Sequence, residues 1–155
     1  MAGFKRFEEI EAWQIARELN LEIYTATAGG AFARDFGLRD QIRRASVSVS
    51  SNITEGFARR TPKDFARFLS IARASAAEVC SQLYLALDLD YVDQTDFDRL
   101  YRLAQRAGGS CGALIRYLRS ADAPAVREPD ESWDIQDPNP DRASEGAAQP
   151  RTLNR

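Results

Sequence analysis

Four segments of this chain carry apolar residues at intervals of three and four positions, the spacing that places side chains on one face of an α-helix. The clearest run begins at Leu38 and continues through Ile42, Ala45, Val49 and Ile53. The three other segments have runs of similar length and spacing. The pattern predicts four helices, over residues 7–28, 38–59, 62–88 and 95–118.

The second of these segments leaves one alternative open. Val47 and Val49 alternate with serines, which is the pattern of a half-buried strand. Serine is also a mediocre helix former, so this segment has the weakest helix propensity of the four. The apolar stripe nevertheless extends over about six turns, whereas the alternation is short, and a helix is therefore favoured.

Signals at the ends of the segments agree with this interpretation. Thr61 precedes Pro62 and Asp64, an order that is typical of a helix N-terminus. Gly29 and Gly30 are expected to end the first helix. The loop after these glycines carries two aromatic residues that we expect to pack onto the helices, Phe32 and Phe36.

Four helices joined by short connections predict an all-α fold, an antiparallel up-down-up-down four-helix bundle, over residues 1–120. Residues 121–155 differ in composition, since they hold five of the six prolines and eight acidic residues against four arginines. We expect this C-terminal tail to be disordered and acidic. Trp133 lies among its acids. It is either a docking motif for a partner protein or a tryptophan that is unused or packs back onto the bundle.

Histidine is absent from the sequence, and this absence limits the available chemistry. A Ser–His or Cys–His pair for nucleophilic catalysis cannot form within the chain. The two cysteines, Cys80 and Cys111, cannot complete a zinc site alone, and their positions indicate small core residues. We therefore expect no catalytic residues, no metal and no cofactor, and we predict that the protein is not an enzyme.

The same features indicate a compartment. No stretch resembles a signal peptide, and none approaches the roughly 18 continuous apolar residues of a membrane span. Two cysteines do not make a disulfide framework, which fits a reducing environment. We expect a cytoplasmic protein with no membrane partner.

Positive charge is concentrated in one region, although the whole chain has a net charge of −2. Residues 34–73 hold nine basic and four acidic residues, a local charge of +5. Such a region can bind the phosphates of a nucleic acid. The alternative is a solvated face whose cations pair with nearby acids, for example Arg43 with Asp40. The candidate nucleic-acid-binding residues are Arg39, Arg43, Arg44, Arg59, Arg60, Lys63 and Arg67.

Three polar residues follow one another along the second predicted helix. Asn52, Glu55 and Arg59 are spaced by three and four positions, so they share one helix face. Three interpretations remain open, namely a buried polar network that fixes the register of the helices, a binding site, or a plain surface ladder. A structural role is favoured.

The segment from Gln41 to Arg60 carries a specific pattern, Gln-Ile-Arg-Arg followed by Ser-Asn-Ile-Thr-Glu-Gly-Phe-Ala-Arg-Arg. Together with a tryptophan in the first helix and two phenylalanines in the third, it resembles the bacterial four-helix-bundle family of 23S ribosomal RNA intervening-sequence proteins. The resemblance covers about residues 4–119. The signature positions are Trp13, Asn52, Glu55, Gly56 and Phe57.

This resemblance implies a homo-oligomer, usually a ring of five bundles, and no known catalysis. It also relates the chain to the accessory protein of diversity-generating retroelements, a basic barrel that binds a reverse transcriptase and nucleic acid. Two functions are compatible with these expectations. The first is an oligomeric scaffold that binds RNA or a ribonucleoprotein through the basic region. The alternative is a homo-oligomeric protein–protein adaptor or accessory subunit, whose acidic tail recruits a protein partner.

Overall fold

The computed structural model describes residues 3–120, and every regular element within them is helical. The elements are η1 (a 3-10 helix, Phe7–Glu9), α1 (Glu11–Ala26), α2 (Gly30–Arg34), α3 (Phe36–Ala58), α4 (Pro62–Asp88) and α5 (Gln94–Leu118). No helix in this range is apolar over enough of its length to cross a membrane. The expectations for the tail and for Trp133 lie outside the described residues.

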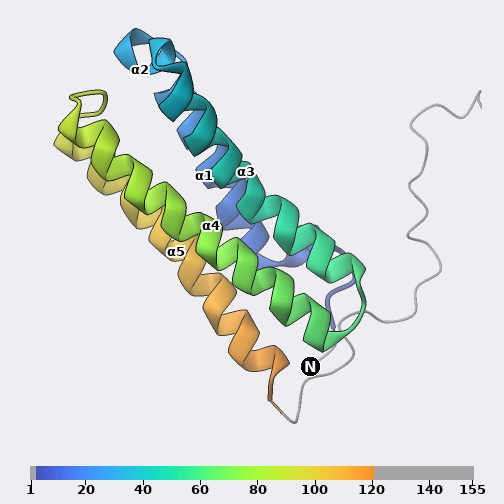
Figure 1. Cartoon of the computed structure of the whole chain (residues 1–155). Coiled ribbons are helices and arrows are strands. Elements are labelled where there is room, and N and C mark those ends of the chain that lie inside the picture. The colour runs from blue at the N-terminus through green and yellow to red at the C-terminus, as the bar shows by residue number, and fades with distance from the viewer. Residues whose placement is uncertain (1–2, 121–155) are drawn as a thin grey trace, which may run out of the picture.

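The four long helices, α1, α3, α4 and α5, form an antiparallel bundle (Figure 1). Each long helix packs against the next one along the chain, and α5 closes the bundle by packing against α1. The connection between α4 and α5 lies at the same end as α2, whereas the α3–α4 turn and the C-terminus of α5 lie at the other end. This arrangement confirms the predicted up-down-up-down four-helix bundle.

Short polar side chains fix the starts of three helices by accepting hydrogen bonds from free backbone amides. Asp35 accepts from the amide of Leu38 at 3.0 Å at the start of α3. Thr61 accepts from the amide of Asp64 at 3.1 Å, as its position before a proline predicts. Asp93 caps α5 in the same way, so this helix begins one residue before the predicted position.

The first predicted helix, residues 7–28, is wrong at both ends. Its first turn is the 3-10 helix η1, and Ile10 is extended before α1 begins, which places its side chain in the core at 1% exposure. At the other end Thr27, not Gly29, follows the last helical residue. The Thr27 side chain is completely buried, and its hydroxyl donates to the carbonyl oxygen of Ile23 at 2.7 Å.

A short helix, rather than a loop, connects α1 to α3. Gly30 begins this helix with φ +65°, a conformation that glycine adopts without strain. The expected packing is correct for Phe32, which is buried and stacks on Tyr91 with ring centroids 5.3 Å apart. It is wrong for Phe36, which is 64% exposed because it begins α3 on the solvent side. There the guanidinium of Arg39 lies 4.7 Å from its ring centroid.

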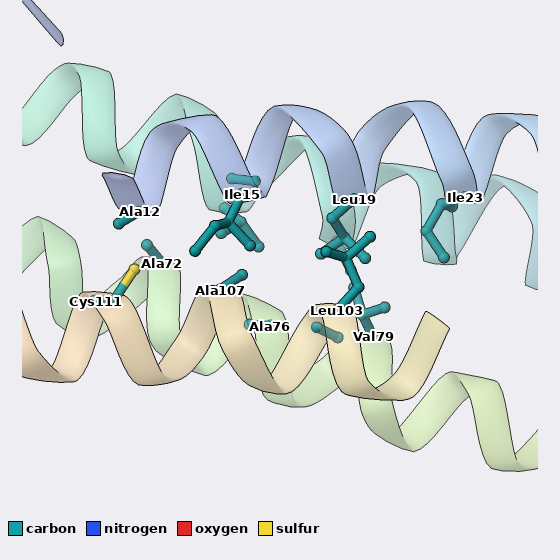
Figure 2. Close-up of a cluster of buried hydrophobic side chains, with 14 of the residues drawn as sticks. Ala12, Ile15, Leu19, Ile23, Ala72, Ala76, Val79, Leu103, Ala107 and Cys111 are labelled. Carbon is teal, nitrogen blue, oxygen red and sulfur yellow. The ribbon is translucent and has the colours of Figure 1, made fainter. Parts of the chain in front are cut away.

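The core is built from the predicted stripes. Ile42, Val49 and Ile53 of α3 are all completely buried. Leu19 of α1 points between the helices toward Leu103 of α5 (Figure 2). The large side chains of α1 thereby fill the space left by small residues of α4 and α5, which are Ala72, Ala76, Ala107 and Cys111.

The serine-rich middle of α3 is helical throughout, which excludes the strand alternative for Val47 and Val49. Val49 faces the core, whereas Val47 is partly exposed. The hydroxyl of Ser48 lies 2.9 Å from the hydroxyl of Ser75 on α4. Asn20 of α1 donates to the hydroxyl of Ser50 at 2.9 Å. The serines thus connect α3 to both neighbouring helices.

Candidate nucleic-acid interface

The seven predicted cations do not form one surface. Three of them lie near the start of α3, and the other four lie around the turn between α3 and α4. Arg43 and Arg59 are 16 positions apart, which corresponds to about 24 Å along a helix axis. We therefore treat two groups separately, the α2-end group (Arg39, Arg43 and Arg44) and the turn cluster (Arg59, Arg60, Lys63 and Arg67).

Arg43 of the α2-end group is used inside the bundle. Its Nε donates to the Thr27 hydroxyl at 2.7 Å, and its Nη2 donates to the Thr27 carbonyl oxygen at 3.1 Å. The guanidinium also lies over the ring of Tyr24, 4.5 Å from the centroid. Because Thr27 is completely buried, these contacts tie the end of α1 to α3. Two of the five guanidinium donors of Arg43 are therefore used inside the bundle.

Arg39 is also occupied. Its Nε donates to Asp40 at 2.8 Å, and its Nη1 donates to the carbonyl oxygen of Ala33 in α2 at 3.1 Å. This hydrogen bond from Arg39 holds the pKa of Asp40 below its usual value, with smaller contributions from the charges of Arg44 and Arg43. Asp40 therefore pairs with Arg39. The ion pair of Arg43 with Asp40, which was expected if this face were simply solvated, does not form. Arg44 is exposed and makes no ion pair within residues 3–120.

All four residues of the turn cluster are exposed to solvent, whereas Arg39 and Arg43 of the α2-end group are partly buried. Arg60, Lys63 and Arg67 make no ion pair with any residue in the described part of the chain. Arg60 follows the C-cap of α3 with φ +65°. Glycine is the residue that usually occupies this position, and another side chain costs about 1–2 kcal/mol there. The chain therefore keeps a cation at a strained position of the turn.

Two arginines of the turn cluster share one aromatic ring. The guanidinium groups of Arg59 and Arg67 lie 5.3 and 4.8 Å from the ring centroid of Phe68. Arg59 also forms an ion pair with Glu55 at 2.7 Å, but both side chains are about half exposed, so this pair contributes little to stability. Phe68 thus restrains two cations from different helices on one side of the turn.

Two further arginines converge although sequence reasoning did not select them. A Cβ atom at Gly112 would lie 3.7 Å from Nη1 of Arg73 and 3.8 Å from Nη1 of Arg116. Neither arginine forms an ion pair within residues 3–120. The two positions are far apart in the sequence, and only the antiparallel register of α4 and α5 brings them together. The glycine at position 112, beside which both guanidinium groups lie, was the sequence feature that could have indicated this site.

The charges of the bundle are unevenly distributed along its length. Because α5 runs antiparallel to α4, Arg116 and Arg119 come to the end that holds the turn cluster (Figure 1). The opposite end carries acidic residues in and around the α4–α5 connection, which are Asp88, Asp90, Asp93, Asp96 and Asp98. The end with the turn cluster is therefore mainly basic, whereas the opposite end holds these acids together with the α2-end group of arginines.

A sequence profile described as "23S rRNA-intervening sequence protein" matches residues 8–112, about two thirds of the chain. The chain belongs to this family. Its fold is also similar to the crystal structure of a protein of unknown function from the S23 ribosomal protein family of Bacteroides thetaiotaomicron. The two are 20% identical, with a TM-score of 0.63, over 68% of this chain and 95% of the other. No curated protein matches the sequence.

The packing around Gly56 accounts for the glycine at this signature position. A Cβ atom there would lie 2.7 Å from the Cβ of Phe68 and 2.9 Å from Cδ2 of Phe65, closer than real contacts allow. Phe57 is buried beside it and meets the ring of Phe65 edge-on, with centroids 6.2 Å apart. Gly56 and Phe57 therefore set the close approach of α3 and α4 just before the turn cluster.

The three-residue ladder of the signature helix does not form one network. Glu55 and Arg59 form a surface ion pair. Asn52 instead donates to the carbonyl oxygen and the hydroxyl of Ser48, at 2.8 and 3.0 Å. The hydroxyl of Ser48 in turn contacts that of Ser75, so Asn52 belongs to a polar contact between α3 and α4.

Trp13, the remaining signature residue, packs at the start of α1. It is partly buried and meets the ring of Phe7 edge-on, with centroids 5.0 Å apart. The guanidinium of Arg17 lies 5.9 Å from its ring centroid. These contacts hold η1 against the bundle, so the position of Trp13 in this family member is one of packing.

The described residues of this family member give no indication of metal chemistry. Within residues 3–120 no three cysteine, aspartate or glutamate side chains gather closely enough to hold a metal ion. Cys80 and Cys111 are both free. Burial raises the pKa of both thiols, that of Cys111 to about 11, so both are protonated at neutral pH and are weak nucleophiles. The absence of enzymatic activity stays a prediction.

Proposed function

We propose that this protein is a non-enzymatic, oligomeric nucleic-acid-binding protein, whose turn cluster contacts the phosphate backbone of RNA or of a ribonucleoprotein. The observation that carries the proposal is the exposure of Arg60, Lys63 and Arg67 at one end of the bundle without ion-pair partners in residues 3–120. Cations that are not neutralised by the protein can pair with phosphate oxygens and release counterions, which supplies sequence-independent affinity.

Two features of the turn support this proposal. Arg60 occupies a backbone conformation that favours glycine, and strain of this kind is often retained where a side chain serves a function. Arg59 and Arg67 are restrained by the ring of Phe68, so less side-chain freedom is lost when they bind a phosphate. The family, named for 23S rRNA intervening sequences, is consistent with an RNA partner in the cytoplasm.

Oligomerisation is part of the proposal because one turn cluster offers few phosphate contacts. The family resemblance implies a homo-oligomer, usually a ring of five bundles. In such a ring five copies of the cluster engage one nucleic acid, and the second and later contacts form at a high effective concentration. A modest cluster on each bundle then gives strong binding by the assembly.

Binding of the full-length protein to a labelled single-stranded RNA, measured by fluorescence anisotropy over a series of salt concentrations, tests the proposal. The triple variant Arg60→Glu, Lys63→Glu, Arg67→Glu should bind far more weakly than the unaltered protein. Its plot of log affinity against log salt should be shallower by about 2, since each lost phosphate contact removes about 0.7 for a single strand.

The matched control is Arg44→Glu, Arg102→Glu, Arg106→Glu, which changes the net charge equally at exposed positions away from the turn. It should retain most of the affinity. Equal loss in both variants would show that only net charge matters, and no binding of the unaltered protein at low salt would overturn the nucleic-acid function.

A second candidate function, a homo-oligomeric protein–protein adaptor or accessory subunit, is favoured by a different observation. Several large apolar side chains of residues 3–120 are exposed, including Leu21 at 67% and Phe36 at 64%. Two others, Tyr24 at 44% and Val47 at 38%, line one pocket, and adjoining exposed apolar groups are typical of surfaces that bind other proteins or further copies of the same chain. If the unaltered protein does not bind RNA, the next measurement is its oligomeric state, determined by sedimentation analysis.

A further inference from the structure

A groove of about 650 Å³ lies between α4 and α5, outside the turn cluster. Its lining is small and apolar in the middle, where Ala76, Ala77, Ala104, Gly108 and Gly109 contribute. The packing of α4 on α5 does not require the glycines. A Cβ at Gly108 would make an ordinary 3.5 Å contact, and one at Gly109 would meet nothing within 4 Å. Glycine at these positions keeps the groove open.

The two ends of the groove differ in chemistry. At one end Tyr84 is 52% exposed, and its ring lies 5.6 Å from that of Tyr101 and 5.0 Å from that of Phe97. At the other end lies Arg73, with Arg116 beside it over Gly112 and no carboxylate paired with either within residues 3–120. This arrangement suits an occupant that carries a large aromatic side chain close to several carboxylates.

We propose that the groove between α4 and α5 binds the segment around Trp133 of the chain's own C-terminal region. This segment reads Glu131-Ser-Trp133-Asp134-Ile135, and residues 121–137 contain six acids against one arginine. Its indole matches the aromatic and small-residue part of the groove. Its carboxylates match the two unpaired guanidinium groups of Arg73 and Arg116. The inference does not depend on the turn cluster or on RNA binding.

The length of the chain permits this contact. The described structure ends just after α5, and the last residue of the groove along that helix toward the C-terminus is Gly109. From Ser120 back to Gly109 is about 17 Å along the helix axis. The 13 residues from Ser120 to Trp133 span up to about 43 Å when extended. Trp133 can therefore reach the whole groove, including its aromatic end.

Cys80 lines the groove and provides a native reporter of its occupancy. The experiment measures the rate at which an aromatic disulfide reagent modifies the thiols of the full-length protein at fixed pH. Cys111 is completely buried and its pKa is raised to about 11, so the faster reaction belongs to Cys80. The variant Cys80→Ala, which should lose the faster phase, verifies this assignment.

Trp133→Ala should raise the Cys80 rate about tenfold, the value expected when a segment covers the groove about nine tenths of the time. Arg116→Gln, which removes a cation without altering the groove lining, should raise it severalfold. The control Leu153→Ala, an apolar residue further along the same region, should leave the rate unchanged. Equal rates in the unaltered protein and Trp133→Ala would overturn the proposal, as would an equal increase in Leu153→Ala.

Discussion

The guanidinium of Arg43 donates one hydrogen bond to the hydroxyl of Thr27 and a second to its carbonyl oxygen. The partner is buried at the end of α1, where a helix leaves carbonyl groups without intrahelical donors. Arg43 therefore supplies donors that the helix end lacks, and it does so across the α1–α3 contact. The hydrogen bonds of Arg43 therefore stabilise the packing of α1 against α3.

Replacement of Arg43 by glutamine should accordingly lower stability. We expect the free energy of unfolding in urea to fall by about 1–2 kcal/mol, because two charge-assisted hydrogen bonds to a buried residue are lost. Arg44→Gln, at the exposed neighbouring position, should stay within about 0.5 kcal/mol of the unaltered protein. Equal effects of the two substitutions would show that the Thr27 contacts contribute nothing.

Gly56→Ala should destabilise the protein through overpacking. The new methyl group would overlap Phe68 and Phe65, and relief of such overlap costs about 1–3 kcal/mol. The midpoint of thermal unfolding should drop by several degrees. Gly37→Ala is the matched control, since its methyl group makes only an ordinary 3.6 Å contact with Asp35 Oδ1 and it removes a glycine from α3. It should raise stability by up to about 1 kcal/mol, and an equal loss in both variants would contradict the overpacking at Gly56.

Arg60 should show opposite effects on stability and on binding. Arg60→Gly relieves the strain at φ +65° and should raise the free energy of unfolding by up to about 1 kcal/mol. It also removes one phosphate contact, so the salt dependence of RNA binding should become shallower by about 0.7. Arg60→Ala separates the two, because alanine loses the contact but keeps the strain. Unchanged RNA binding in both variants would exclude Arg60 from the interface.

The thiol of Cys111 should make stability depend on pH in the alkaline range. Burial raises its pKa from 9.0 to about 11 in the folded protein. Between these pH values the thiol has lost its proton in the unfolded chain but keeps it in the folded protein. The contribution of Cys111 to the free energy of unfolding is therefore fully present below pH 9 and is lost as the pH rises through 11. The size of the effect is roughly 2–3 kcal/mol.

Urea denaturation of the unaltered protein and of Cys111→Ala over this pH range measures the effect. The tyrosines and other groups titrate in both proteins, so only the difference between the two curves reports Cys111. The variant should lose less stability than the unaltered protein as the pH rises. Parallel curves would mean that the thiol titrates equally in both states.

The helices were predictable because their apolar spacing is a local property of the sequence. Ile42 and Ile53 lie on one stripe in the sequence and are both completely buried in the structure. The ends of α1 were not predictable in the same way. Ile10 is extended so that it reaches the core, and Thr27 ends the helix through contacts with Arg43, a residue of another helix. Such contacts depend on tertiary structure.

The candidate interface was predictable in part, for a related reason. Neighbours in sequence across one turn, such as Arg60 and Lys63, stay together in space, and the cluster they form was recognised. Arg43 lies near the start of α3, and Arg60 and Lys63 lie beyond its other end. A sum of charges over a stretch of sequence does not show how far apart the charges are in space. Arg73 and Arg116 come close to Gly112 only through the register of α4 against α5, which the sequence alone does not provide.

The uneven distribution of charge between the two ends of the bundle has a consequence for how the molecule meets a polyanion. A body with a mainly cationic end, and an opposite end where aspartates lie together with the α2-end arginines, experiences a torque in the field of a charged strand. If the turn cluster binds RNA as proposed, we expect the bundle to turn before contact, so that the α3–α4 turn arrives first and the Asp88–Asp98 end is directed away. Fewer collisions are then wasted in unproductive orientations, and this advantage disappears when added salt shortens the range of the field.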